Sequence, residues 1–200
     1  MLQTKLYTGS DFPELLDETS GKFIKLPEKF SLEGFEPSQN PMVPMVHKDY
    51  VFTKSLFRDV ALFLARPHGH ALWLAAPTGS GKTSVIAELA GRLNYPVYSI
   101  TCNSRMEFDD LVGRPMVISK PGEQPSVKFI YGPLARAMKS GGILLLNEVD
   151  LCDPAQLSGL NDVLEGRPLT ITQNGGEQIQ PHPMFRVVVT ANSAGNGDET

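Results

Sequence analysis

The 200-residue chain has the composition of a soluble globular domain, with 41% hydrophobic and 20% charged residues. Its net charge of −4 offers no broad basic face, so nucleic-acid binding is not expected. The longest apolar runs are too short to span a bilayer, and the N-terminus has no apolar stretch followed by a cleavage site. We therefore expect a cytoplasmic protein without membrane attachment.

Residues 1–46 differ in composition from the rest of the chain. They carry turn and linker chemistry, including prolines at positions 13, 27, 37, 41 and 44. Within them the pattern predicts a short helix over 11–18 and a strand over 22–26. We expect residues 1–46 to be an arm or linker laid over a domain formed by residues 47–200.

From Asp49 onward, helical and strand patterns alternate along the chain. Helices are predicted from a Thr53 cap to Pro67, over 82–93 and over 153–166. In the last of these, Asp153 is the predicted N-cap, Gln156 completes a capping box and Gly166 ends the helix. Apolar strands are predicted over 71–76, 96–101, 143–146 and 185–192. This alternation predicts an α/β fold with a parallel sheet.

Two segments interrupt this alternation and read as inserted β-hairpins. One covers residues 115–132 around Pro121-Gly122, and the other covers 168–181 around Asn174, Gly175 and Gly176. Pattern alone leaves open whether they are simple surface excursions.

The stretch "APTGSGKTS" lies between the first predicted strand and its helix. Such a loop turns backbone N–H groups inward around an anion, and the helix N-terminus adds the positive end of its dipole. Lys82 supplies a cation for the β- and γ-phosphates, and the Thr83 hydroxyl can coordinate magnesium. Ala76 replaces the first glycine of the motif, which is tolerable if φ stays negative. The predicted nucleotide-binding residues are Pro77, Thr78, Gly79, Ser80, Gly81, Lys82, Thr83 and Ser84.

The predicted strand "ILLL" over 143–146 runs directly into the polar residues Asn147 and Glu148. Glu148 is the candidate base that polarises the attacking water; the alternative is a surface acid beside the next helix. Asn147 stands where an aspartate usually helps to hold magnesium. Its amide oxygen can still bind a magnesium-bound water, but without negative charge. Asp150 and Asp153 are expected to be cap and turn residues.

Asn192 ends the apolar strand "VVVTAN". A polar amide at the end of a neighbouring buried strand can align the attacking water against the γ-phosphate. Asn after a strand is usually only a turn residue, so this assignment depends on the phosphate loop and on Glu148.

In order along the chain, several segments together resemble the AAA+ ATPases of the dynein-related subtype, in particular the MoxR-type branch that includes the cobaltochelatase small subunit. The resemblance covers residue 43 to the last residue. Its motifs are "VPMVHKDYVF", "APTGSGKTS", "FDDLVG", "YGPLARAMKSGGILLLNEVD", "LNDVLEGRPLTI" and "HPMFRVVVTANSAGNGDET".

The resemblance implies a three-layer P-loop fold that binds ATP and Mg²⁺ between neighbouring subunits of a hexameric ring. The hairpin at about 116–130 resembles the helix-two insert that faces the ring's pore. The one at about 168–180 resembles the hairpin before sensor 1, which would be Asn192. Members remodel or activate a partner, often one with a von Willebrand factor A domain, and the cobaltochelatase uses ATP to drive metal insertion into a corrin ring.

The sequence departs from the family at Ala76 and Asn147, and its last residue falls just past the predicted sensor 1. We expect either an excerpt of a longer chain or a natural remnant, with the helical lid absent. The family also has an arginine finger and a sensor 2 arginine. Neither role can be matched to any of five arginines in this sequence, namely Arg105, Arg114, Arg136, Arg167 and Arg186. Hydrolysis by the 200 residues alone is thus left open.

Three functions remain open at this stage. The first is an ATP-hydrolysing ring subunit that remodels a partner, as a chaperone or a chelatase-like motor. The second is a nucleotide-binding switch or assembly module that hydrolyses little. The third is a P-loop small-molecule kinase, against which Asn192 and the two hairpins argue.

Overall fold

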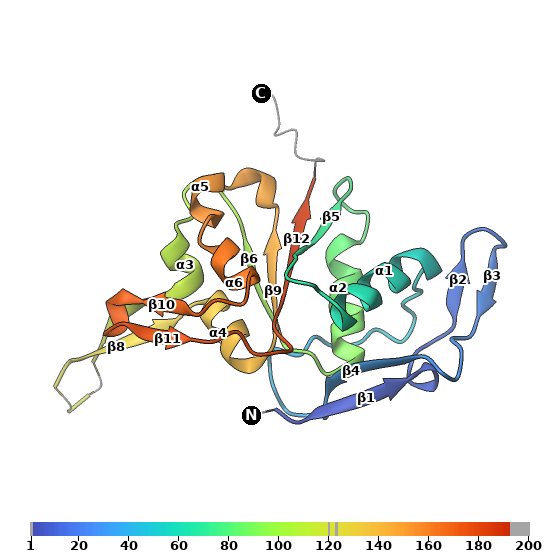
Figure 1. The fold of residues 1–200 in the computed structure, drawn as a ribbon, viewed down its shortest axis with the longest axis horizontal. Helices are drawn as coiled ribbons and strands as arrows, with labels where there is room; N and C mark the ends of the chain where they lie inside the picture. Colours follow the sequence, from blue (N-terminus) through green and yellow to red (C-terminus); the bar gives the residue numbers. More distant parts are fainter. Residues whose placement is uncertain (1, 120, 123, 193–200) are drawn as a thin grey trace.

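A parallel four-stranded sheet forms the centre of the protein in a computed structural model that describes residues 2–119, 121–122 and 124–192. The strand order is β5-β12-β9-β6, and each neighbouring pair is parallel (Figure 1). The strands are β5 (Leu72–Ala75), β6 (Val97–Thr101), β9 (Ile143–Asn147) and β12 (Arg186–Ala191). This confirms the predicted parallel α/β sheet. The last residues of the predicted domain, 193–200, lie outside the described residues.

The two central strands are buried on both faces, as their unbroken apolar sequences predict. Ile143 and Leu145 of β9 pack into one hydrophobic cluster, whereas Leu144 and Leu146 pack into another. Because side chains alternate along a strand, these clusters lie on opposite faces of the sheet. The register places Leu145 beside Val188 of β12, so both layers of apolar side chains continue across the sheet.

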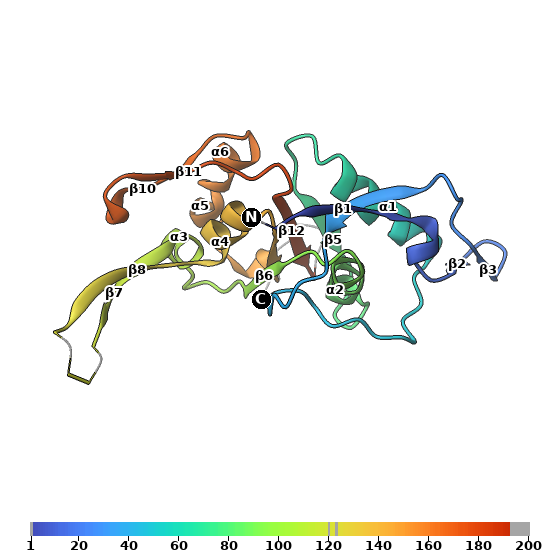
Figure 2. The ribbon, with the colours of Figure 1, turned by 90° about the horizontal axis from the view of Figure 1, so that it is seen from below.

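Helices cover both faces of the sheet, which gives the expected three-layer arrangement (Figures 1 and 2). One face carries α1 (Lys54–Ala65) and α2 (Lys82–Arg92), both close to their predicted bounds. Thr53 is the N-cap residue of α1 by position, but its side chain makes no capping hydrogen bond. The opposite face carries α3 (Phe108–Val112), α4 (Pro133–Ser140), α5 (Pro154–Leu157) and α6 (Leu160–Leu164).

The prediction of one helix over 153–166 was wrong in its length. Two short helices, α5 and α6, replace it, and Gly159 between them packs where a Cβ would meet the Phe108 ring. Asp153 is an N-cap as predicted, because its carboxylate accepts a hydrogen bond from the Ala155 N–H at 2.9 Å. Gln156 forms no capping box; its side-chain oxygen accepts instead from the Phe108 N–H at 3.1 Å. Tertiary contact with α3 thus overrides the local capping pattern.

Both predicted hairpins are present. The first pairs β7 (Gly113–Ile118) with β8 (Ser126–Tyr131), and two residues of its turn, 120 and 123, lie outside the described residues. The second pairs β10 (Leu169–Ile171) with β11 (Glu177–Ile179) through the 3₁₀ turn η3 (Thr172–Asn174). Both extend to the same side of the sheet (Figure 2). Glu177 of β11 joins them, because it accepts a hydrogen bond from the hydroxyl of Tyr131 in β8 at 2.7 Å. Lys139 of α4 also donates to Glu177, at 2.9 Å.

Residues 2–46 form two small antiparallel strand pairs, one below α1 and α2 and the other beside α1 (Figure 1). The elements are β1 (Thr4–Thr8), the 3₁₀ turn η1 (Gly9–Asp11), β2 (Leu15–Asp17), β3 (Lys22–Ile24) and β4 (Ser31–Phe35). The helix predicted over 11–18 was wrong: Leu15 and Leu16 pair with Ile24 and Phe23 across a hairpin instead. The strand predicted over 22–26 is confirmed as β3. Side chains such as Phe35, which is fully buried, belong to the same cluster as α1 and α2.

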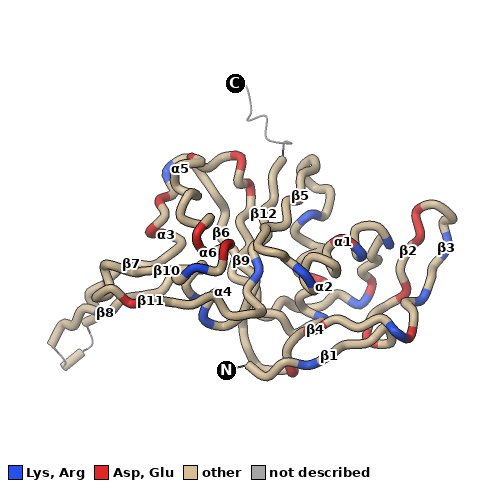
Figure 3. Tube along the Cα trace, in the orientation of Figure 1, with Lys and Arg blue, Asp and Glu red and all other residues tan. Residues whose placement is uncertain are grey.

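No helix among the described residues is both long and apolar enough to cross a membrane. Acidic and basic residues are interspersed along the described part of the chain (Figure 3).

Candidate functional site

The loop between β5 and α2 has the backbone conformation that an anion cradle requires. Gly79 and Gly81 have φ of +81° and +85°, in the region that favours glycine. A Cβ at either position would meet nothing within 4 Å, so glycine is needed there for conformation and not for space. Ala76 is not among the positive-φ residues, as its place in the motif required.

Helix α2 opens directly from this loop. Gly81 is its N-cap residue and has no side chain with which to occupy the N–H groups of the first turn. Those N–H groups and the helix dipole make the start of an 11-residue helix a favourable place for phosphate oxygens.

Lys82 connects the loop to the end of β12. Its ammonium group donates to the carbonyl of Ala76, to that of Pro77 at 3.1 Å and to the amide oxygen of Asn192 at 3.3 Å. The Thr78 hydroxyl donates to the same amide oxygen at 3.2 Å. Asn192, predicted to be a water-aligning residue, therefore lies within hydrogen-bonding distance of two residues of the phosphate loop.

Asn147 lies at the end of β9 beside the start of α2. Its amide oxygen accepts hydrogen bonds from the Thr83 hydroxyl at 3.2 Å and from the Thr190 hydroxyl at 3.4 Å. The Thr83 hydroxyl oxygen and the Asn147 amide oxygen, both predicted to hold magnesium, are therefore adjacent. Both are uncharged oxygen atoms, and Mg²⁺ prefers oxygen ligands. The residues fit a magnesium ion held partly through water, with no charge from Asn147.

Glu148 follows in a backbone conformation that is rare for a residue with a side chain. Its φ and ψ are 55° and 46°, in the left-handed region, and it is half-buried. Its N–H donates to the Thr190 hydroxyl at 3.3 Å. Strained conformations of this kind concentrate at functional sites, where the surrounding structure holds them.

These residues line a single cleft of about 450 Å³. Its lining consists of Thr78, Gly79, Ser80, Gly81, Lys82, Thr83, Ser84, Thr101, Asn147, Glu148, Thr190 and Asn192. Among these described residues, Lys82 and Glu148 carry the only charges. Pro77 does not line the cleft and contributes its carbonyl to Lys82.

Two cleft residues, Thr101 and Thr190, were not predicted from the sequence. Each is a threonine at or near the carboxyl end of a mainly apolar strand, which is the signal that could have identified them. Asp150 lies in the 3₁₀ turn η2 (Val149–Leu151), as a turn residue should, and it also accepts from the Asn192 N–H at 3.2 Å. It therefore helps to hold the end of β12.

The two cysteines lie close to the cleft but are poor nucleophiles. Both are buried and neither forms a disulfide. Burial raises the pKa of the Cys102 thiol to about 12, and it also raises the pKa of Cys152. At neutral pH both remain thiols, so the site offers no thiolate chemistry.

The parallel sheet, the glycine-rich loop before α2 and the polar residues that end β9 and β12 define a P-loop α/β core of the ATPase type. The AAA domain of the dynein-related subfamily matches residues 71–200, which is more than half of the chain. The chain belongs to this family, as its motifs predicted. The cobaltochelatase-like resemblance is also confirmed by the relatives described next.

Among proteins of similar sequence, the aerobic cobaltochelatase subunit CobS of a Sinorhizobium species is 30% identical over 158 residues, or 79% of this chain and 47% of CobS. YojN, an uncharacterized protein of Bacillus subtilis, is 32% identical over 139 residues, or 70% of this chain and 45% of YojN. The crystal structure of a candidate ATPase from Cytophaga hutchinsonii has a TM-score of 0.52 at 21% identity, and the match covers 70% of this chain and 38% of that one. This last likeness shows a shared fold. The chain spans about half the length of the curated relatives it matches.

Proposed function

We propose that this chain binds ATP with magnesium and hydrolyses it, as one subunit of a ring that remodels or activates a partner protein. The observation that supports this best is the convergence of the phosphate loop with polar residues from two neighbouring strands in one cleft. Lys82, Asn147, Glu148 and Asn192 come from three separate segments and line that cleft together.

Each residue has a distinct role in this proposal. The N–H groups at the start of α2 and the Lys82 ammonium bind the β- and γ-phosphates. Thr83 and Asn147 would hold magnesium, with a water molecule between the ion and the Asn147 amide. Bound magnesium would neutralise charge on the phosphates during transfer. Glu148 takes a proton from the attacking water, and the Asn192 amide aligns that water.

The contacts of Asn192 suggest how nucleotide binding prepares the site. Its amide oxygen accepts from Lys82 and from Thr78. A γ-phosphate that draws the Lys82 ammonium toward itself leaves the amide oxygen available to a water molecule. In this proposal the same lysine therefore binds phosphate and couples its arrival to the water-aligning amide.

A second candidate function is a nucleotide-binding switch that hydrolyses little. It is favoured by the neutral Asn147, since an amide holds magnesium less tightly than a carboxylate would. The cleft geometry favours hydrolysis over this alternative, because Glu148 and Asn192 both line the same cleft as Lys82. A small-molecule kinase receives less support. Among the described residues that line the cleft, only Lys82 and Glu148 are charged, so no additional charged side chain is present to select an acceptor molecule.

The assembly and the partner are inferred from the family. One relative is by name a cobaltochelatase subunit. We propose a hexameric ring with ATP between neighbouring subunits, and a partner that carries a von Willebrand factor A domain or a comparable client protein. A cytoplasmic location, without binding to membranes or nucleic acid, completes the proposal.

The products of ATP turnover separate the three functions. The protein is incubated with ATP and magnesium, and ADP and free phosphate are both quantified, with and without candidate client proteins or small-molecule acceptors. Equal amounts of ADP and free phosphate, increased by a client, support the remodelling ATPase. ADP that appears only with an acceptor, without free phosphate, indicates a kinase, whereas bound ATP that stays intact under all conditions indicates a switch.

A further inference from the structure

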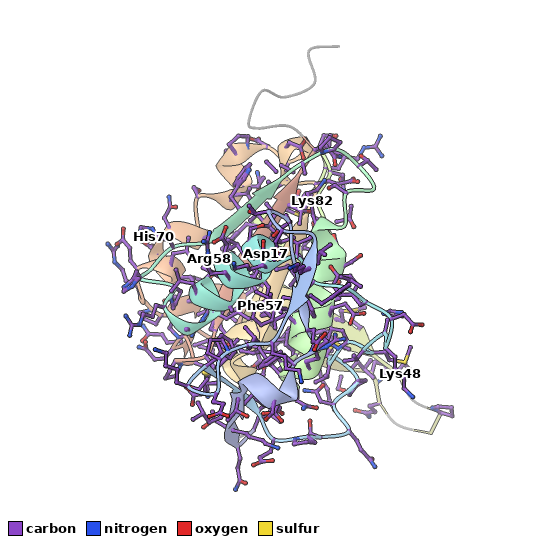
Figure 4. All side chains as sticks on the ribbon, turned by 90° about the vertical axis from the view of Figure 1, so that its right-hand side faces the viewer. Asp17, Lys48, Phe57, Arg58, His70 and Lys82 are labelled. Carbon is purple, nitrogen blue, oxygen red and sulfur yellow. The ribbon has the colours of Figure 1, made fainter. Side chains whose placement is uncertain are left out.

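An apolar groove opens between the first 46 residues and α1, on the side of the molecule seen in Figure 4. We call it the arm groove, and its volume is about 480 Å³, within the range of about 300–1,000 Å³ typical of ligand sites. It is lined by Leu15, Ile24, Lys25, Leu26, Pro27, Phe30, Ser31, Leu32, Lys54, Phe57, Arg58, Ala61, Leu62 and Ala65. None of these residues belongs to the nucleotide cleft, and the matched AAA domain begins later, at residue 71.

Helix α1 builds one wall of the arm groove with two parallel rows of side chains. Phe57, Ala61 and Ala65 are spaced by four residues and form an apolar row, because residues four apart share a helix face. The adjacent row is Lys54, Arg58 and Leu62, also spaced by four. The first row begins with the fully buried Phe57, whereas Leu62 in the second is 61% exposed. An exposed large apolar side chain beside an apolar groove favours a protein contact.

The opposite wall is fixed in place. Leu16 of β2 donates its N–H to the Phe52 carbonyl at 2.8 Å, and Lys54 forms an ion pair with Asp17 at 2.8 Å. The Ser55 hydroxyl also donates to Glu18. Because these contacts tie the β2–β3 hairpin to the start of α1, the groove is preformed, which lowers the entropic cost of binding.

The charged side chains that line the arm groove, among the described residues, are all basic. Lys25 lies on one wall, Lys54 and Arg58 lie one helical turn apart on the other, and no acidic side chain is among the described lining residues. Lys54 is already paired with Asp17, so Lys25 and Arg58, one on each wall, are the lining cations that a ligand can reach. The Arg58 side chain is 72% exposed, and the side chain of Asp59, with which it forms an ion pair, is 58% exposed. Exposed pairs of this kind contribute little, so Arg58 can exchange its partner for a carboxylate of a ligand.

From this combination we infer that the arm groove binds a peptide segment of a partner protein, one that presents apolar side chains next to Asp or Glu residues. Cations on both walls match several carboxylates along a peptide better than the single head group of a fatty acid. The inference is independent of the nucleotide site and holds whether or not the protein hydrolyses ATP.

Selection from a phage-displayed library of random 12-residue peptides tests this inference on the 200-residue chain. Enriched peptides are synthesised with fluorescein and their Kd is measured by fluorescence anisotropy. They should be acidic overall, with at least two large apolar residues. Arg58→Glu or Ala65→Phe, which reverses a rim charge or fills the groove, should raise the Kd by about tenfold or more. Lys48→Glu, the same charge change at an exposed lysine outside the groove, should leave it unchanged; Lys25→Glu repeats the charge test on the other wall.

Several results would overturn the inference. Enriched peptides without an acidic preference would refute the proposed ligand chemistry. A Kd that neither Arg58→Glu nor Ala65→Phe changes would show that the groove does not bind them. Displacement of the peptides by laurate at a comparable Kd would indicate a site for small amphiphiles. A doubled mass in analytical ultracentrifugation, abolished by Ala65→Phe, would show that the groove is an interface between copies of this chain.

Discussion

Replacing Thr190 with valine removes one hydroxyl from the base of the nucleotide cleft while keeping the shape of the side chain. That hydroxyl donates to the Asn147 amide at 3.4 Å and accepts from the Glu148 N–H at 3.3 Å. Thr190 is only 2% exposed, so water cannot readily replace the lost partner. We expect the substitution to disturb both Asn147, the last residue of β9, and Glu148, which follows it.

The size of the effect follows from these contacts. Leaving a buried polar group unsatisfied costs about 1–3 kcal/mol. Both bonds are longer than the usual range for strong hydrogen bonds, so the lower half of that interval, about 1–2 kcal/mol, is expected for the free energy of unfolding. Glu148 also holds a left-handed conformation that costs about 1–3 kcal/mol. If Thr190 helps to maintain it, turnover should fall by about tenfold, which corresponds to about 1.4 kcal/mol in the barrier.

Urea unfolding, ATP binding by calorimetry and steady-state ATP turnover measure the three quantities separately. Thr190→Val should lower the unfolding free energy and kcat, while the affinity for ATP changes little, because the phosphate loop is untouched. Thr190→Ser keeps the hydroxyl and should restore kcat. If Thr190→Val turns over ATP at the wild-type rate, or if serine fails to restore it, Thr190 does not position Glu148 and the reasoning is refuted.

Three further predictions concern the phosphate loop, the metal position and a buried ion pair. Lys82→Ala should abolish most ATP affinity in titration calorimetry without changing the unfolding midpoint, since Lys82 is the only cation of the cleft among the described residues; wild-type affinity would disprove the phosphate-loop assignment. Asn147→Asp adds a charge beside Thr83, so the magnesium concentration for half-maximal ATP turnover should fall with a smaller change in the saturated rate; an unchanged magnesium dependence would place Asn147 outside the metal shell. Burial raises the pKa of Glu88, but hydrogen bonds from Arg92 and His47 outweigh it and hold that pKa below its usual value. Because a lowered pKa stabilises the fold above the unfolded value of 4.5, Glu88→Ala should lower the unfolding free energy by about 3–5 kcal/mol at pH 7, and its difference from wild type should shrink as the pH falls below 4.5. A pH-independent difference in urea unfolding between pH 3 and 7 would contradict the role of the Glu88 charge.

The central sheet and the nucleotide cleft could be anticipated because their signals are local. The strand "ILLL" is buried on both faces, and the glycines of the loop at positions 79 and 81 both have positive φ. Since parallel strands end at one edge of a sheet, the residues that follow β9 and β12 were expected to meet there. The structure places Asn147, Glu148 and Asn192 at that edge, where their proposed chemical roles can be tested.

The features that were not anticipated depend on contacts between distant segments. Leu15 was assigned to a helix, but a core shared with α1 favours the strand that pairs with Ile24. Gln156 matches a capping box locally, yet the backbone of Phe108 takes its side chain. Thr190 reads as an ordinary strand residue until the register of β12 and β9 brings its hydroxyl to Glu148. None of these contacts has a sequence signal at fixed spacing.

The proposed hydrolysis depends most directly on Glu148, and the variant Glu148→Gln tests it with little change of shape. Glutamine retains hydrogen bonding but cannot take a proton from water. The measurement is the rate of phosphate release at saturating ATP and magnesium, together with the Kd of ATP for the same preparations. We predict that ATP binds as in the wild type while phosphate release falls by about 100-fold or more, the scale usual for a general base. Wild-type phosphate release by Glu148→Gln would contradict the assignment and move the activation of water to another residue.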